Sequence, residues 1–176
     1  YGSCSGHIKE NAPLNPSTPY AASKACGDLS LIPYYKNYNF PVVFTRATNV
    51  YGAHQQLYRI IPRTVIYIKQ NKKIQLQGGG KAVKSYIHIR DVCSATLQIA
   101  RNGKNGDIYH ISPDGEGISI VDLVSLICGK MGRPFKDCVS MVGERLGQDA
   151  FYLIDSDKLR KSLGWKPGIC LEKGIT

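Results

Sequence analysis

Tyr20 and Lys24 are the two side chains of this sequence whose types and spacing could do chemistry. They lie in the stretch PYAASKA, residues 19–25. On a helix, residues four apart lie on one face, so the phenol and the ammonium would project together. A phenol has a pKa of about 10 and is a poor base at neutral pH, but a nearby ammonium stabilises the phenolate. Such a pair can take a proton from a hydroxyl group while a hydride leaves the same carbon.

The element that must position this pair is a helix. Ser17 or Thr18 can cap it, and Pro19 suits its first turn. We expect it to run over about 19–37, with a late kink or an early stop at Pro33. The spacing alone leaves an alternative open, because a tyrosine and a lysine four residues apart occur by chance on many ordinary helices.

Strands and helices alternate along the rest of the sequence. Val42, Val43 and Phe44 open the stretch FPVVFTRATNVYG as an unbroken apolar run, which predicts a strand buried on both faces. Further strands are expected at 73–77, 85–89, 106–112 and 137–143, and helices at 58–71, 90–102, 118–132 and 155–165. This order indicates an α/β protein with parallel or mixed strands.

Composition favours a single globular domain of 176 residues, 43% of them hydrophobic. No apolar run approaches the ~20 residues that a membrane helix needs, and the first residues do not resemble a signal peptide, so we expect a soluble cytoplasmic protein. The formal net charge of +10 favours an anionic partner, either nucleic acid or a nucleotide diphosphate. The basic residues are spread along the chain, which weakens the nucleic-acid interpretation.

The six cysteines predict no metal site, because none forms a CxxC pair and they are not clustered as zinc ligands would be. Cys26, Cys93 and Cys128 occur among apolar residues of expected helices. We expect these three to be small buried hydrophobic residues.

Several further stretches, in the same order, resemble the extended short-chain dehydrogenase/reductase family. PYAASKA resembles the family's YxxxK helix, and VVFTRATNVYG matches its V-x-x-R-x-x-N-x-Y-G. SYIHIRDVCSA, GDIYHIS and KLRKSLGWKP are similar to R-D-Y-I-H-V-x-D-V-A, G-x-x-Y-N-I-G and K-x-x-x-L-G-W-x-P. The resemblance covers nearly the whole chain. It implies the C-terminal part of a Rossmann-like parallel sheet, at about 1–52 and in parts of 85–112, plus a small mixed α/β substrate-binding domain.

Two stretches are most similar to nucleotide-sugar 4,6-dehydratases of the dTDP-glucose type, namely NVYGAHQQLYRIIP and ERLGQDAFYLIDSDKL. This resemblance implies NAD-dependent oxidation of a nucleotide-hexose at C4, loss of water across C5–C6 and formation of a 4-keto-6-deoxy sugar nucleotide. A nucleotide-sugar 4-epimerase is the alternative within the class. An inactive sugar-nucleotide-binding module is the alternative of another class, and a nucleic-acid binder is motivated by charge alone.

The resemblance also assigns roles to single residues. Tyr20 would be the acid–base residue at the sugar C4 hydroxyl, and Lys24 would lower its pKa and hold the nicotinamide ribose. The residues expected to border NAD are Tyr20, Lys24, Arg46, Ala47 and Thr48. Those expected to bind the nucleotide sugar are Asn49, Arg59, Gln75, Lys84 and Arg145. The chain departs from the family's pattern at Lys84, usually arginine, at Ser85, usually aspartate, at Gln148, usually histidine, and at Ala53, usually proline.

One part of the family's pattern is not found. The glycine-rich turn that meets the pyrophosphate of NAD has no counterpart in this sequence, since Gly78–Gly80 come too late. We therefore interpret the chain as the C-terminal half of such an enzyme, with an incomplete cofactor site and no activity of its own. Such a fragment would expose an apolar sheet edge. Relatives pair through helices that include the Tyr-Lys one, which implies a homodimer.

Overall fold

The structure, a computed structural model, describes residues 1–2, 6–144 and 150–176. The helices are α1 (Pro19–Tyr38), α2 (Ile60–Lys69), α3 (Ile89–Asn102), α4 (Ile120–Lys130), α5 (Phe135–Cys138), α6 (Asp157–Leu163), α7 (Leu171–Gly174) and the short 3₁₀ helix η1 (Gly78–Gly80). The strands are β1 (His7–Ile8), β2 (Phe44–Ala47), β3 (Asn49–Tyr51), β4 (Ile74–Gln77), β5 (Val83–Lys84), β6 (Tyr86–His88), β7 (Ile108–Ile111), β8 (Ile118–Ser119), β9 (Val139–Val142) and β10 (Phe151–Ile154).

The described strands pair in parallel except β5 with β8, which are antiparallel. β2 pairs with β7 and β3 with β6, so the segment 44–51 changes its partner strand at Thr48. In α/β sheets, ligands bind beyond the carboxyl ends of strands at points where the strand order changes. The expected α/β fold with a parallel sheet is thereby confirmed, and the partner change marks where a site belongs.

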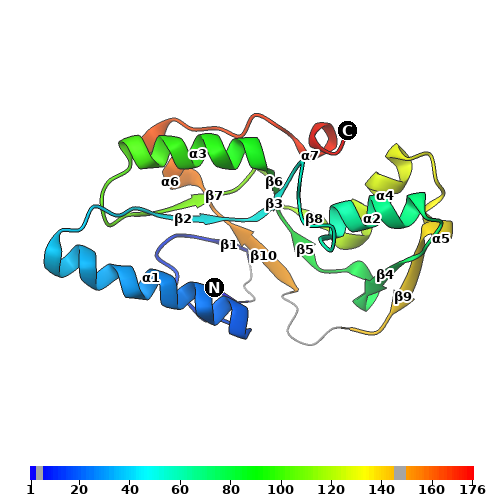
Figure 1. The fold of residues 1–176 in the computed structure, drawn as a ribbon, viewed down its shortest axis with the longest axis horizontal. Helices are drawn as coiled ribbons and strands as arrows, with labels where there is room; N and C mark the ends of the chain where they lie inside the picture. The colour runs from blue at the N-terminus through cyan, green and yellow to red at the C-terminus, as the bar shows by residue number, and fades with distance from the viewer. Residues whose placement is uncertain (3–5, 145–149) are drawn as a thin grey trace.

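Two hydrophobic cores divide the chain into two lobes (Figure 1). The sheet lobe packs α3 and α6 on the β2–β7 pair, and its core includes Ile87, Ile99, Ile111 and Trp165. The second lobe is built from α2, α4, α5, β4 and β9. Its buried residues include Ile68, Ile74, Leu76, Leu123 and Ile127. The boundary between two lobes is a common position for a ligand.

Helix α1 lies on the side of the β2–β7 pair opposite α3 (Figure 1). It contains no buried residue. Apart from Ala22, its half-buried positions follow one helical stripe, Ala21, Ala25, Asp28, Ile32 and Tyr35. The Tyr35 ring packs on Gly106, where an added Cβ would lie 2.2 Å from Cε1 of the ring. α1 is therefore attached through a narrow stripe and a few specific contacts.

The helix expected over about 19–37 is confirmed as α1, without an early stop at Pro33, because Pro33 is on the exposed side, where water can satisfy the carbonyl that loses its donor. Two expectations about strands are wrong. The strand after α1 begins at Phe44, so Val42 and Val43 precede it. The segment 137–143 starts as the end of α5 and becomes strand only at Val139.

The expectation for the cysteines holds for Cys128 alone, since Cys26 and Cys93 are exposed. Cys26 lies on α1, which buries no residue, and Cys93 lies off the face of α3 that buries Asp91, Ala95 and Ile99. Apolar neighbours in the sequence do not decide which face of a helix is covered. No helix among the described residues has the length and apolar character needed to span a bilayer.

Candidate active site

The first turn of α1 places Tyr20 and Lys24 on the same side of the helix. Thr18 occupies the N-cap in extended conformation, and its hydroxyl accepts a hydrogen bond from the Ala21 backbone N–H at 3.2 Å. Lys24 Nζ lies 5.6 Å from the centroid of the Tyr20 ring. Tyr20 is 68% exposed, and no described residue forms a hydrogen bond with its hydroxyl. The phenol is thus free to meet a ligand, with an ammonium one turn away.

Arg46 lies on β2, beneath α1. Its Nη2 is 2.6 Å from Oδ2 of Asp28, and its Nε donates to the same oxygen at 2.8 Å. The guanidinium carbon is 4.9 Å from the centroid of the Tyr1 ring, and Nη1 donates to the Tyr1 hydroxyl. The side chain is 15% exposed. Its guanidinium is therefore occupied in attaching α1 to β2.

Thr48 and Asn49 fix the point where the strand changes partner. Oγ1 of Thr48 donates to the Ser85 carbonyl at 2.8 Å, and the backbone and side-chain N–H groups of Asn49 donate to the same carbonyl at 3.2 and 3.0 Å. Thr48 and Ser85 are buried. One side-chain amide hydrogen of Asn49 is used in this contact, and its side-chain carbonyl oxygen can still accept a hydrogen bond from a ligand. Ala47 ends β2 beside them and is half-buried.

The backbone of Gly52 lies too close to α3 for any side chain, which explains the glycine of the NVYG motif. Its φ is +152°, and an added Cβ would lie 2.5 Å from Cγ2 of Ile89 at the start of α3. Any side chain would push α3 away from the end of β3. The motif therefore fixes how closely the strand and the helix approach at this edge of the sheet.

Arg59 and Gln75 belong to the second lobe and are both exposed. Arg59 is the N-cap residue of α2, and its guanidinium carbon lies 5.4 Å from the centroid of the Tyr58 ring. The start of α2 has no side-chain cap, so its first N–H groups are free to bind an anion together with Arg59. Arg145 lies outside the described residues.

Lys84 borders a cavity of about 500 Å³ between β5 and the segment 167–173. Three carboxylates, those of Asp114, Glu116 and Glu172, line the same cavity, against the ammonium groups of Lys84 and Lys173. The excess of negative charge makes this cavity a poor place for a diphosphate. The structure thus does not bring Lys84 and Arg59 together around one anion site.

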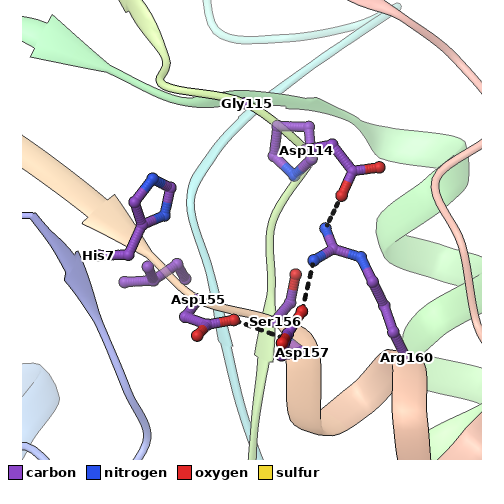
Figure 2. Close-up of a pocket in the computed structure, with 9 residues that line it drawn as sticks. His7, Asp114, Gly115, Asp155, Ser156, Asp157 and Arg160 are labelled. Atoms are coloured by element: carbon purple, nitrogen blue, oxygen red, sulfur yellow. Dashed lines mark hydrogen bonds and ion pairs between the residues drawn. The ribbon is translucent and has the colours of Figure 1, made fainter.

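A second cavity of about 340 Å³ lies at the carboxyl end of β10. Figure 2 shows Arg160 between Asp114 and Asp157, with Nη–Oδ distances of 2.8 and 3.7 Å. Oδ1 of Asp155 accepts a hydrogen bond from the Asp157 backbone N–H at 2.7 Å, which satisfies the first N–H group of α6. None of the residues predicted to form the site lines this cavity.

His110 is a functional candidate that sequence reasoning missed. It is fully buried on β7, with Nε2 at 2.6 Å from the Tyr1 hydroxyl. The sequence carried one signal for it, since His110 occupies the position of the asparagine in the family's G-x-x-Y-N-I-G pattern.

Comparison with known families matches one profile, GDP-mannose 4,6 dehydratase, to residues 1–176. The chain belongs to the GDP-mannose 4,6 dehydratase family. The recognition made from the YxxxK, NVYG and LGWKP stretches is therefore confirmed.

Relatives of this GDP-mannose 4,6 dehydratase family member are dTDP-glucose 4,6-dehydratases. A dTDP-D-glucose 4,6-dehydratase of Homo sapiens is 34% identical over 179 residues, which is 99% of this chain and 51% of that protein. The dTDP-glucose 4,6-dehydratase of Xanthomonas campestris is 30% identical over 178 residues, 97% of this chain and 50% of that protein. The chain thus spans about half the length of these relatives.

Solved structures agree with these relatives. DesIV, a dTDP-glucose 4,6-dehydratase of Streptomyces venezuelae crystallised with NAD bound, superposes with a TM-score of 0.94 at 32% identity, covering 99% of this chain and 54% of that one. The dTDP-glucose 4,6-dehydratase of Bacillus anthracis in complex with NAD gives 0.93 at 33%, covering 99% and 55%. A UDP-glucuronic acid 4-epimerase of Bacillus cereus gives 0.90 at 24% identity, over 99% of this chain and 55% of that one, which shows a shared fold alone.

Proposed function

We propose that the protein containing this chain is an NAD-dependent nucleotide-sugar 4,6-dehydratase of the dTDP-glucose type. The observation that carries the proposal is the exposed Tyr20 hydroxyl with the Lys24 ammonium one helical turn away. The human relative and DesIV, both more than 30% identical to this chain, are dTDP-glucose 4,6-dehydratases, which favours dehydration over epimerisation.

The residues around Tyr20 and Lys24 are compatible with a bound nicotinamide. Tyr20 and Lys24 are exposed, and half-buried Ala47 and buried Thr48 lie at the end of β2. Bound NAD would accept and return a hydride. Among the described residues no glycine-rich turn connects a strand to a helix N-terminus, so the pyrophosphate half of its site is to be supplied from outside this chain. We expect the 176-residue chain alone to be inactive for this reason.

In the proposed reaction Tyr20 takes the proton from the C4 hydroxyl of the sugar. Before this step Lys24 stabilises Tyr20 as the phenolate, which becomes a neutral phenol when it accepts the proton, and Lys24 also holds the nicotinamide ribose. Asn49 contacts the phosphate side of the substrate, and Gln75 contributes from β4 of the second lobe, while Arg59 and Arg145 supply positive charge for the diphosphate. Lys84 lacks the fork of the arginine that the family usually has there, and it borders carboxylates, so we do not assign it to the diphosphate.

The reaction is tested by incubating the complete enzyme with dTDP-glucose and NAD. We expect a 4-keto product, detected by its absorbance after addition of base, and a 6-deoxy sugar after reduction of that product. Formation of dTDP-galactose without a keto product would assign the 4-epimerase instead. If the complete enzyme does not change the sugar at all, the alternative of an inactive sugar-nucleotide-binding module would be favoured.

Replacement of Arg59 is expected to weaken nucleotide binding. Arg59→Met removes a guanidinium next to the uncapped start of α2, and a hydrogen bond to a charged group contributes about 1.5–3 kcal/mol, so the Kd for dTDP should rise roughly 10-fold or more. Calorimetry on the 176-residue chain measures this, with NAD as a second ligand expected to give no heat. Lys69→Met, at the opposite end of α2, is the control. If Arg59→Met and Lys69→Met bind dTDP with equal affinity, Arg59 does not contact the nucleotide.

We propose that the protein forms a homodimer through the outer face of α1. Leu31, Tyr34 and Tyr38 are spaced by three and four residues on this face and are 38%, 56% and 76% exposed. Double substitution of Leu31 and Tyr34 by glutamate should convert the dimer to a monomer because it places charges in an apolar contact. Sedimentation velocity distinguishes the two states, and Lys36→Glu on the same helix is the control. A dimer that survives the double substitution must pair elsewhere.

A further inference from the structure

A line of four side chains connects α1 to the interior of the sheet lobe. The Asp28 carboxylate on α1 accepts from Arg46 on β2, and Arg46 in turn donates to the Tyr1 hydroxyl. The same hydroxyl is 2.6 Å from Nε2 of His110 on β7. The Tyr1 and His110 rings also meet edge to face, with centroids 5.4 Å apart. We call these four residues the relay.

The direction of each proton in the relay follows from its last member. Nδ1 of His110 lies 3.0 Å from the carbonyl oxygen of Asp155, which can only accept, so Nδ1 carries the proton. In a neutral ring Nε2 is then the acceptor, and the Tyr1 hydroxyl donates to it. The Tyr1 oxygen keeps its lone pairs for Arg46. The whole relay is satisfied only while His110 is neutral.

Protonation of His110 would break this arrangement. Nε2 would then present a hydrogen to the hydrogen of the Tyr1 hydroxyl, and a second positive charge would lie next to Arg46. His110 is 0% exposed, so water cannot screen either conflict. The Glu10 carboxylate, which accepts from the His110 backbone N–H at 3.2 Å, offsets the charge only in part.

The electrostatics agree with a neutral ring. Burial lowers the pKa of His110, and Arg46 adds to this effect, while Glu10 and the carbonyl groups of Asp155 and Ile8 act in the opposite direction. A histidine whose pKa is lower in the folded state binds fewer protons there than in the unfolded chain. Its contribution to stability is therefore complete above the ordinary pKa of about 6.5 and is lost as the pH falls toward the lowered value.

We propose that neutral His110 is a positioning residue that, through Tyr1 and the Arg46–Asp28 ion pair, holds α1 and hence Tyr20 and Lys24 in register with the sheet. α1 buries no residue, so these contacts are a large part of its attachment. Asp28 lies two turns after Tyr20 and one turn after Lys24. The catalytic consequence rests on the proposed function, whereas the effect on α1 does not.

Hydrogen exchange of the 176-residue chain between pH 5 and 8, corrected for intrinsic rates, tests the relay. We expect the α1 amides (19–38) to lose protection below about pH 6.5, while those of α3 (89–102) stay protected. His110→Asn keeps a polar group that does not titrate, and should make the protection of α1 independent of pH. Tyr1→Phe keeps the ring but removes the hydroxyl, and should speed exchange of α1 about 5-fold at pH 7. His54→Asn, in an exposed loop, is the control.

Two results would overturn the proposal. One is an α1 that opens at acid pH in His110→Asn as it does in the unsubstituted chain. The other is unchanged protection of α1 in Tyr1→Phe, a mild variant that is expected to fold. In the complete enzyme the acid limb of the kcat profile should move to lower pH in His110→Asn, with KM unchanged. If no variant turns over dTDP-glucose, the proposed function fails while the exchange data still decide on the relay.

Discussion

Tyr20→Phe is expected to lower kcat of the complete enzyme on dTDP-glucose by about 10²- to 10⁴-fold, the usual contribution of a general acid–base residue. The substitution removes one oxygen atom that is exposed and has no hydrogen-bond partner among the described residues, so the helix should not change. KM should stay within a few-fold, because the lost proton transfer belongs to the transition state and not to substrate binding.

Tyr38→Phe is the matched control for this experiment. It removes the same atom from the same helix, at a position that is 76% exposed and lies five turns from Tyr20. We expect its turnover to equal that of the unsubstituted enzyme. If Tyr20→Phe also retained full turnover, Tyr20 would be an ordinary helix residue, and the enzymatic interpretation of PYAASKA would be wrong.

Trp165→Ala is expected to lower the free energy of unfolding by about 3–5 kcal/mol, the range for deletion of a large buried aromatic side chain. Trp165 is 4% exposed and packs in the core of the sheet lobe. Its indole N–H donates to the Ser94 hydroxyl on α3 at 3.1 Å, so truncation leaves both a cavity and a lost hydrogen bond. Urea unfolding followed by circular dichroism measures the change.

The segment that follows Trp165 has a contact of its own with α3. The Asp91 carboxylate on α3 accepts from the backbone N–H groups of Gly168 and Ile169, both at 3.0 Å, and this holds the segment in place. Lys166→Ala changes the exposed neighbour of Trp165 and should alter stability by less than ~0.5 kcal/mol. A loss below about 1 kcal/mol for Trp165→Ala would show that the core closes over the missing ring.

Local chemistry made much of α1 predictable. Thr18, Pro19 and the alanines after it define the start of a helix, and any helix places residues four apart on one face. Ser119 likewise marks the start of α4, because its hydroxyl accepts a hydrogen bond from the backbone N–H of Asp122, three residues later. These features depend only on neighbours in the chain. Whether Pro33 would stop the helix could not be decided locally, because its cost depends on whether solvent reaches the carbonyl four residues earlier.

Arg46 shows the limit of sequence reasoning at the site. The resemblance associated it with NAD, but its motif could not show that Asp28 and Tyr1 occupy its guanidinium. Asp28 is 18 residues away, and His110, which completes the relay, is 109 residues from Tyr1. Partners at such distances are brought together only by the packing of α1 on the sheet.

The sequence by itself determined the family, the parallel α/β fold and the pairing of a phenol with an ammonium on one helical turn. Those features follow from periodicity, capping and motif order, which are written in adjacent residues. Only the tertiary structure decided that α1 buries nothing, that Lys84 borders a carboxylate-rich cavity, and that a neutral His110 connects the sheet to α1. Burial and long-range hydrogen bonds depend on which surfaces meet when the chain folds, and no local pattern records that.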